Sequence, residues 1–357
     1  MNIYYASLYY KNDHVTGANK RFDEIGKRLI KKYKNKFKCI VTENNRPSWC
    51  PEGNCLTVSS YNSKIQRVIT WFRFSVLMNS LSSGVFINDF MPTPIIFFRN
   101  KHKHFQLIHD LRNFDEFKRG GLGFLTSYFQ KWQLSRVDKI ITVSNYTANM
   151  LNKFCGKNKS DIIVSYNGVD GRVLSYKNKR DIDILYIATF EPRKNHISLL
   201  KALEIAKMPL NIVFVGSDLG LREKVREYSK YVSNKCEHKI SFYEQISSDE
   251  LDKIYSSSKI FCSPSLYEGF GMPIVEAYQH GCQVVCSDIE VFREVTLNRA
   301  RYFNPKSAED IYEKIFSALS ETTDSDLSVI ANEVVDFFSW DKIFDRLCIS
   351  LDEINYE

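Results

Sequence analysis

The chain has 357 residues, more than one hydrophobic core usually accommodates, so two domains are expected. Hydrophobic residues make up 44% and charged residues 25%, which excludes a largely disordered chain. Residues 1–170 carry 26 Lys and Arg against 12 Asp and Glu, a balance of +14, whereas the remainder has a balance of −7 within a total of +7. The two halves are therefore expected to bind different partners.

The N-terminal sequence and the distribution of the cysteines favour a cytoplasmic protein. The N-terminal residues lack a basic segment followed by an apolar run, so no secretory signal is expected. The apolar stretch Val85–Phe98 is interrupted by polar residues and prolines and is too short to cross a bilayer. The nine cysteines are scattered, as expected for reduced thiols. The close pairs, Cys50 with Cys55 and Cys282 with Cys286, lack the C-x-x-C spacing of a zinc knuckle, so no metal site is expected.

Short apolar runs alternate with amphipathic helical patterns in the first half, which predicts parallel α/β units. The expected strands lie near Ile3–Leu8, Cys39–Val41, Val85–Ile87, Ile95–Phe98, Phe105–Ile108, Lys139–Val143 and Ile162–Ser165. The expected helices lie near Lys20–Tyr33, Lys64–Asn79, Leu122–Leu134 and Asn145–Phe154. The polar run Ser175–Arg180 then has no periodicity and is the expected linker.

The alternation restarts after this linker. The expected strands lie near Asp183–Ala188, Leu210–Val215, Lys239–Phe242, Lys259–Cys262 and Gln283–Cys286. The expected helices lie near His196–Lys207, Leu221–Val232, Asp249–Ser257, Pro273–His280, Ala308–Leu319 and Asp341–Leu351. The predicted fold is α/β, with two Rossmann-like doubly wound domains over residues 1–175 and 181–335. A terminal helix within 336–357 could pack back on the N-terminal domain. Ligands are expected at the carboxyl ends of the strands.

The stretch Phe261–Ala277 carries the most informative pattern. A β-run is followed by a loop with two glycines, and Pro273 stands where a helix should begin, a position that tolerates proline well. The backbone N–H groups of Gly271 and Met272, together with the helix dipole, would form an anion site.

Two glutamates flank this turn. Glu276 lies in the first turn of the expected helix, where its carboxylate can accept both hydroxyls of a ribose. Glu268, in the loop, can face a second hydroxylated group. A lone glutamate would more simply cap or solvate the helix start. Two of them around a Gly-x-Gly turn favour a phosphorylated sugar as ligand.

The pattern Glu268-x7-Glu276 around Gly-Phe-Gly resembles the E-x7-E signature of retaining nucleotide-sugar glycosyltransferases of family four, which have the GT-B fold. Other segments fall in the order of that family: Tyr186–His196, Asp249–Tyr255, Phe292–Val295, Tyr302–Pro305, Ile108–Asp110, Val143–Tyr146 and Asn167–Asp170. The resemblance implies two Rossmann-like domains that face a central cleft. The first would bind the acceptor and the second the nucleotide-sugar donor.

The resemblance also implies roles in the second domain. Arg193 and Lys194 would neutralise the donor diphosphate, because a leaving diphosphate needs positive charge where its own charge grows. Glu276 would hold the ribose and Glu268 a hydroxyl of the donor sugar. The backbone amides of Gly269, Phe270 and Gly271 would lie near sugar and phosphate.

In the first domain, His109 would contact the donor sugar near its reacting carbon. Family members often have two adjacent glycines in the loop that opens the first helix, whereas this chain has Gly17 followed by Ala18, and Lys20 could supply charge instead. The predicted catalytic residues are His109, Glu268, Arg193 and Lys194. The predicted donor-binding residues are Gly17, Lys20, Arg193, Lys194, Glu268, Gly269, Phe270, Gly271, Met272 and Glu276.

No metal and no cofactor are expected at this site. Metal-dependent transferases of the other common fold hold their ion with an Asp-x-Asp pair at the end of an apolar strand. Here Asp181 and Asp183 precede or open a strand, and Asp324 and Asp326 lie in a polar stretch where a helix begins. Both pairs are interpreted as solvated termini.

The basic stretch Lys27–Lys38 has apolar residues at helical spacing. It is either an ordinary helix with a cationic outer face or a surface that attracts anionic lipid. The segments Lys101–His104 and Trp71–Phe74 could add to such a surface. Nucleic acid is not expected, because no aromatic RNA-binding signature accompanies the charge.

These patterns predict a retaining, metal-independent glycosyltransferase. It would move a hexose from a UDP- or GDP-linked sugar to a lipid-linked or polysaccharide acceptor, peripherally bound at the cytosolic face of the inner membrane. Bacterial lipopolysaccharide O-antigen, capsule or exopolysaccharide synthesis would suit it. The alternatives are a GT-B sugar-nucleotide epimerase or phosphorylase, or a catalytically dead sugar-nucleotide-binding protein.

Overall fold

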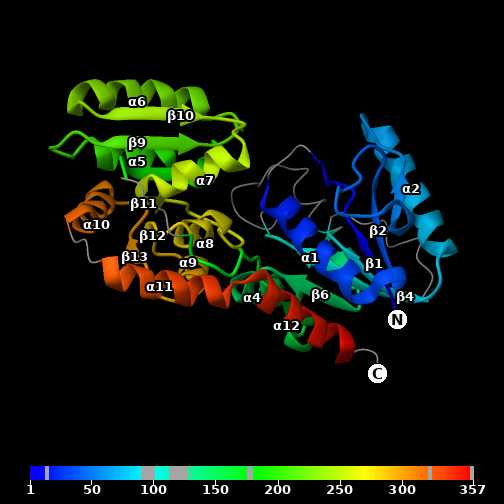
Figure 1. The fold of residues 1–357 in the computed structure, drawn as a ribbon. Coiled ribbons are helices and arrows are strands. Elements are labelled where there is room, and N and C mark those ends of the chain that lie inside the picture. Colours follow the sequence, from blue (N-terminus) through cyan, green and yellow to red (C-terminus); the bar gives the residue numbers. More distant parts are fainter. Residues whose placement is uncertain are drawn as a thin grey trace. The chain divides into compact units, whose positions relative to one another are not determined.

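The computed structural model describes residues 1–12, 16–89, 101–111, 128, 130–174, 180–320 and 324–353 (Figure 1). The chain divides into two compact units, Met1–Asn167 with Trp340–Glu357, and Gly168–Ser339. Each unit contains one sheet, and every strand pairing described within it is parallel. The predicted fold class of two doubly wound α/β domains is therefore confirmed.

The sheet of the first unit has seven strands in the order β3-β2-β1-β4-β5-β6-β7. The strands are β1 Asn2–Ala6, β2 Phe37–Thr42, β3 Cys55–Val58, β4 Gly84–Asn88, β5 His102–Ile108, β6 Lys139–Thr142 and β7 Ile162–Val164. The helices are α1 Gly17–Tyr33, α2 Lys64–Ser80, α4 Asn145–Cys155 and α12 Trp340–Glu353, with short 3₁₀ turns at Lys34–Lys36, Glu52–Asn54 and Lys159–Asp161.

Helix α1 shows how the sequence builds this unit. The side chain of Thr16 caps its start by accepting a hydrogen bond from the backbone N–H of Asn19 at 3.1 Å. Its apolar residues recur at helical spacing and are buried, as Phe22, Ile25 and Leu29 are. On its outer face, two basic residues form ion pairs with α12.

The ion pairs join Arg28 to Asp341 at 2.8 Å and Lys32 to Asp352 at 3.1 Å. Part of the charge in the basic stretch Lys27–Lys38 is therefore used within the unit. The same stretch ends in the buried strand β2. The geometry favours the ordinary-helix interpretation of this stretch over a dedicated lipid-binding face.

The sheet of the second unit has six strands in the order β10-β9-β8-β11-β12-β13. The strands are β8 Ile182–Ile187, β9 Asn211–Val215, β10 Lys239–Tyr243, β11 Ser258–Ser263, β12 Gln283–Ser287 and β13 Arg301–Phe303. The helices are α5 His196–Leu203, α6 Arg222–Cys236, α7 Ser248–Ser256, α8 Met272–Gln279, α9 Glu290–Val295, α10 Ala308–Ser320 and α11 Asp324–Phe337, and a 3₁₀ turn covers Pro192–Lys194.

Several elements differ from the sequence-based expectation. Strands β3 and β13 and helix α9 are additional to the expected elements, and each is six residues or shorter. The 14-residue helix α11 was expected only at its start, near Asp324. The expected strand Ile95–Phe98 lies outside the described residues, as do most of the helix expected near Leu122–Leu134 and nearly all of the linker expected at Ser175–Arg180.

Strand β5 begins at His102, earlier than expected, and this corrects the surface assigned to Lys101–His104. Side chains alternate along a strand, so Lys101 and Lys103 are exposed while His102 and His104 are buried. Burial, the largest effect, lowers the pKa of His104 to about 4, so this histidine is neutral at physiological pH. The two histidines do not add to a cationic surface.

None of the helices within the described ranges combines the length and the hydropathy that are needed to cross a bilayer.

Candidate functional site

The Arg193-Lys194 pair lies in a 3₁₀ turn that follows the carboxyl end of β8. Three hydrogen bonds hold this turn in place, one from β8 itself and two that join the turn to the loop after β11. The Tyr186 hydroxyl donates to the carbonyl oxygen of Lys194 at 2.7 Å, and the backbone N–H of Leu266 donates to the carbonyl oxygen of Arg193 at 2.8 Å. The side-chain amide of Asn195 donates to the carbonyl oxygen of Pro264 at 3.0 Å. The turn is thus fixed before any ligand binds.

Glu268 joins both cations. Its Oε2 lies 3.0 Å from Nη1 of Arg193, and its Oε1 lies 2.5 Å from Nζ of Lys194. The hydroxyl of Ser265 donates to Oε1 at 2.9 Å. All three ionised side chains are only 12–14% exposed, so solvent screens these contacts weakly. The structure brings together three of the four predicted catalytic residues in one cluster.

The charges of this cluster balance in the absence of ligand. Arg193 also pairs with Glu191, whose Oε1 lies 2.7 Å from Nη2, so two cations face two carboxylates. Burial would raise the pKa of Glu268, but the charges of Lys194 and Arg193 and their hydrogen bonds lower it below its ordinary value. Glu268 is therefore ionised at neutral pH. An incoming diphosphate would have to share the cations with this carboxylate.

Helix α8 begins at the other end of the same loop. Gly271 caps it with a φ of +95°, and Met272 rather than Pro273 is its first residue. In the described parts of the chain, no hydrogen-bond acceptor faces the backbone N–H of Gly271 or of Met272. These two groups, at the positive end of a helix, can bind an anion.

We expect Gly271→Ala to lower the free energy of unfolding by about 1–3 kcal/mol, measured by urea denaturation. The substitution forces an unfavourable positive φ, and the new Cβ would lie 2.9 Å from Cε1 of the buried Phe292. Gly220→Ala is the matched control, because Gly220 has a φ of +93° with nothing within 4 Å of its added Cβ. If the two variants lost equal free energy of unfolding, the contact with Phe292 would contribute nothing to the destabilisation.

Glu276 is the fifth of the eight residues of α8, so it lies just beyond the first turn in which it was expected, and it is partly exposed. Its Oε2 accepts a hydrogen bond from the hydroxyl of Tyr255 at 3.0 Å. Tyr255 is buried and stacks on His280 with ring centroids 4.9 Å apart, so its hydroxyl is held in place. Burial, followed by the charge of Glu276, raises the pKa of Tyr255 well above its ordinary value. Tyr255 therefore remains a hydrogen-bond donor to the carboxylate at all physiological pH values.

The loop between the two glutamates is anchored by its aromatic residue. Phe270 is 3% exposed, and its ring meets that of Phe338 edge-on at 5.5 Å. Its side chain therefore belongs to the core of the second unit. Any ligand contact of Phe270 would come from its backbone, as was predicted for it and for Gly269.

The remaining predicted site residues belong to the first unit. His109 follows β5 directly, and its Nε2 donates to Oδ1 of Asp89 at 2.6 Å. Asp89 follows the neighbouring strand β4, its carboxylate is 2% exposed, and its backbone N–H donates to the carbonyl oxygen of Ala6 at 2.8 Å. Asp89 thus fixes the orientation of the His109 ring. The contact with Asp89 uses Nε2 and not Nδ1.

Gly17 and Lys20 lie in the first turn of α1, which a buried arginine holds in place. Arg21 donates from Nη1 to the carbonyl oxygen of Ser165 at 3.0 Å and to Oδ1 of Asn167 at 3.3 Å. It is 1% exposed and was not among the predicted residues. The first turn of α1 is therefore tied to the segment that follows β7.

Some residues that hold the predicted site residues in place were not predicted from the sequence. Asp89 could have been found as a carboxylate directly after a buried strand. Tyr255 and Ser265 carried no such signal, because their contacts to the two glutamates depend on how the loops fold.

The chain is similar to known glycosyltransferases along most of its length. The model for group 1 glycosyl transferases matches residues 174–332, and the model for glycosyltransferase family 4 matches residues 17–172. The O-antigen chain mannosyltransferase RfbU of Salmonella typhimurium is 28% identical over 204 residues, which is 56% of this chain and 56% of that protein. The chain spans about half or less of the length of the curated relatives it matches.

Solved structures of the same fold cover 99% of the chain at low sequence identity. Sucrose-phosphate synthase from Thermosynechococcus elongatus has a TM-score of 0.80 at 15% identity, with 99% of that chain covered. Anabaena HepE in complex with UDP and glucose has a TM-score of 0.77 at 14% identity, with 100% covered. These neighbours confirm the predicted GT-B fold.

Proposed function

The chain belongs to the group 1 glycosyltransferases of glycosyltransferase family 4, and we propose that it is a retaining, metal-independent mannosyltransferase. It takes mannose from a nucleoside-diphosphate donor, GDP- or UDP-linked, and passes it to a lipid-linked or polysaccharide acceptor. The sugar is inferred from the mannosyltransferases among its relatives. Binding of a uridine nucleotide by a neighbour of the same fold supports a nucleotide-sugar donor.

The observation that carries this proposal is the cluster of Arg193, Lys194 and Glu268 beside the loop that opens α8. Two cations and the N–H groups of Gly271 and Met272 offer positive charge to a diphosphate. Glu276, held by Tyr255, offers a carboxylate to the ribose hydroxyls. Glu268 then either binds a hydroxyl of the sugar or keeps the two cations in place.

Retention would follow from departure and attack on the same face of the sugar. The bond between the anomeric carbon and the diphosphate oxygen breaks, and its electron pair stays with the diphosphate. The acceptor oxygen bonds to that carbon and passes its proton to the leaving phosphate. A covalent role for Glu268 is disfavoured, because an ion-paired carboxylate with a lowered pKa is a poor nucleophile.

The positions of the charged side chains are the basis for proposing a mechanism without a metal ion. Lys194 and Arg193 supply the positive charge that a metal ion supplies in other transferases. Asp183 lies at the opposite, amino end of β8, where its carboxylate pairs with Lys259 at 2.7 Å and accepts from the backbone N–H of Asn211 at 2.8 Å. Its partners therefore give it a structural role.

A thermal-shift panel tests the donor. GDP-mannose, UDP-glucose, ADP-glucose and TDP-glucose would each be added with excess EDTA, and again with Mg²⁺ or Mn²⁺. We expect at least one nucleotide-sugar to raise the melting temperature in EDTA. A rise that occurs only with added metal would overturn the metal-independent mechanism, and no rise with any donor would overturn the site. Transfer to an added acceptor, rather than release of an altered free sugar, separates transferase from epimerase or phosphorylase.

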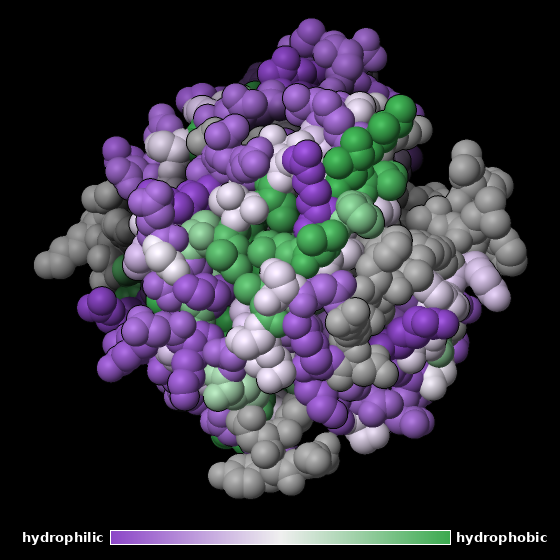
Figure 2. Space-filling view, turned by 90° about the vertical axis from the view of Figure 1, so that its right-hand side faces the viewer, coloured by the Kyte–Doolittle hydropathy of each residue, from purple (hydrophilic) through white to green (hydrophobic). Residues whose placement is uncertain are grey.

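Helix α2 of the first unit is the surface that would contact the membrane in which a lipid-linked acceptor resides. Ile65, Val68, Ile69, Phe72 and Val76 are each between 46% and 76% exposed. Their spacing places them along one stripe of the helix, and the helix contains three basic residues and no acidic one. Figure 2 shows the side of the molecule that carries α2, where hydrophobic side chains reach the surface between hydrophilic ones. A basic helix with an exposed apolar stripe suits the interface of an anionic bilayer, where a lipid-linked acceptor would reside.

We expect the double variant Ile65→Ser with Val68→Ser to lower binding to phosphatidylglycerol-containing vesicles at least about tenfold in a co-sedimentation assay, because two apolar side chains no longer enter the bilayer. Val329→Ser is the control, since Val329 is 66% exposed on α11. Equal binding by the double variant and the wild type, or no vesicle binding by the wild type, would contradict membrane docking through α2.

A further inference from the structure

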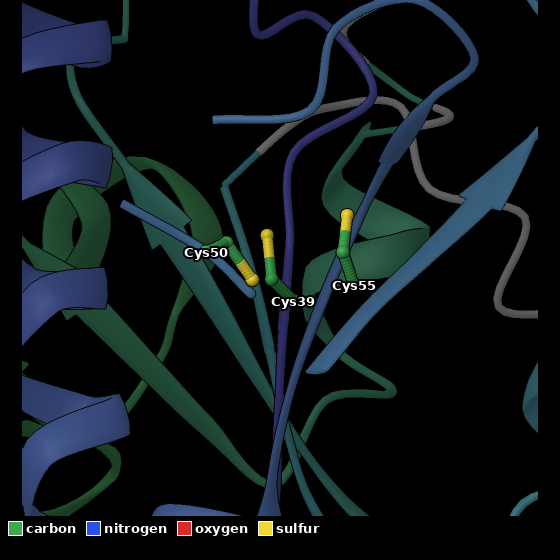
Figure 3. Close-up of side chains that lie close together, drawn as sticks. All are labelled: Cys39, Cys50 and Cys55. Atoms are coloured by element: carbon green, nitrogen blue, oxygen red, sulfur yellow. The ribbon is translucent and has the colours of Figure 1, made fainter. Parts of the chain in front are cut away.

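Three cysteine side chains gather at one edge of the sheet of the first unit. The Sγ atoms of Cys39, Cys50 and Cys55 all lie within 4.8 Å of one another (Figure 3). Cys39 and Cys50 are buried, and Cys55 is partly exposed. Among the described residues this is the one group of three His, Cys, Asp or Glu side chains close enough together to hold a metal ion.

Strand register accounts for two members of the cluster. Cys39 on β2 and Cys55 at the start of β3 are direct partners in neighbouring parallel strands. Directly paired residues in neighbouring strands point to the same face of the sheet, so these two thiols lie next to each other. Strand β3 is the edge of the sheet, which leaves room on this face for the loop that carries the third thiol.

The loop between the strands places Cys50 over this face. Trp49 donates from Nε1 to Oδ1 of Asp23 on α1 at 2.7 Å, and its ring packs against that of Phe22 at 6.2 Å. Gly26 of α1 makes room for this ring, because an added Cβ would lie 2.3 Å from it. The backbone N–H of Cys50 donates to the carbonyl oxygen of Pro47 at 3.0 Å, which closes a turn. Contacts that do not involve sulfur therefore hold the third thiol in place.

We propose that Cys39, Cys50 and Cys55 bind one Zn²⁺ ion as thiolates, with water in the fourth position on the exposed side of Cys55. Thiolates are preferred ligands of zinc, and sulfurs at about 2.3 Å in a tetrahedral site lie about 3.8 Å apart. The observed separations, at most 4.8 Å, thus need to close by no more than about 1 Å. Three thiolates and Zn²⁺ leave one negative charge, which the nearby Arg46 offsets.

The ion would have a structural role. It would join the loop of residues 43–54 to the edge strands β2 and β3, so that binding would stabilise this part of the unit. The sequence pattern pointed away from such a site, because Cys50 and Cys55 lack the spacing of a zinc knuckle. The third ligand, Cys39, is eleven residues earlier in the chain and joins them through strand register. The proposal is independent of the catalytic function.

The test uses the full chain, reduced, treated with a chelator and transferred to metal-free buffer. Zn²⁺ is titrated against a chromophoric chelator, and Co²⁺ is added as a spectroscopic substitute. We expect one equivalent of Zn²⁺ per chain, a rise in melting temperature, and the thiolate-to-cobalt charge-transfer absorption of a sulfur site. Cys55→Ser should weaken Zn²⁺ binding by at least about 100-fold and remove this absorption, since even outer-shell changes cost 10–100-fold.

Cys155→Ser and Cys236→Ser are the matched controls, because these thiols are also partly exposed and lie outside the cluster. Both should bind Zn²⁺ as the wild type does. Cys55 is the variant of choice because its partial exposure favours a folded product, which circular dichroism would verify. The proposal is overturned if the reduced wild type binds no Zn²⁺, if Cys55→Ser binds it equally well, or if the three thiols only form a disulfide on oxidation and take up no metal.

Discussion

Replacing Lys194 with alanine is expected to lower kcat/KM for sugar transfer by about 10²- to 10³-fold. The ammonium group of Lys194 is one of two cations at the turn after β8 and would stabilise the negative charge that develops on the leaving diphosphate. Removing one such preorganised donor costs this much in other enzymes. Initial rates of nucleotide release in the presence of acceptor measure the effect.

Replacing Lys194 tests the diphosphate site more directly than replacing Arg193. Arg193 also donates to the carbonyl oxygen of Tyr267 at 3.1 Å and pairs with Glu191, so its loss would disturb the loop itself. Lys201→Ala provides the control, because Lys201 is an exposed lysine on the adjacent helix α5. If Lys194→Ala were folded and retained wild-type activity within twofold, the turn would not be the diphosphate site.

The second large effect is expected for donor affinity in Glu276→Gln. Hydrogen bonds to a charged group contribute about 1.5–3 kcal/mol, so loss of the carboxylate charge should raise the Kd of the nucleotide-sugar about 10- to 100-fold. Tyr255→Phe removes only the hydroxyl that holds this carboxylate and should raise the Kd by a smaller factor, about fivefold. Isothermal titration calorimetry would measure both.

A 2′,3′-dideoxy nucleotide separates ribose binding from a general loss of the site. It should bind the wild type about as weakly as Glu276→Gln binds the ordinary nucleotide, and the variant should no longer distinguish the two ligands. Glu313→Gln, at an exposed position on α10, should behave as the wild type does. If the dideoxy nucleotide lost the same affinity in Glu276→Gln as in the wild type, Glu276 would not contact the ribose.

The fold followed from local patterns because parallel α/β units have strong periodic signals. The buried strands β8, β11 and β12 each contain an apolar run of at least three residues, and each is followed along the chain by a helix with one apolar face. The shorter elements β3 and β13 were missed because three or four residues at a sheet edge carry too little pattern. His102 and His104 were misplaced because strand alternation, rather than residue type, decides which side chains are buried.

The candidate site was less predictable than the fold. Glu268 was found from its position beside the Gly-x-Gly turn, and Arg193 and Lys194 were found from the family resemblance. The structure brings all three into one ion-pair cluster. Their supporting contacts could not be predicted, because Tyr255 and Asp89 meet their partners only through tertiary folding. Long-range pairs such as Arg28 with Asp341 have no local signature at all. The same holds for the three thiols, which strand register and one loop bring together.

The most direct test of the central proposal is the anomeric configuration of the product made in excess EDTA. The wild type and Lys194→Ala would be incubated with GDP-α-mannose and synthetic lipid-linked saccharides, and the new linkage would be determined by NMR. We expect an α-linked mannose from the wild type and little product from the variant. A β-linked product, or a product that forms only after a divalent metal is added, would contradict the proposal.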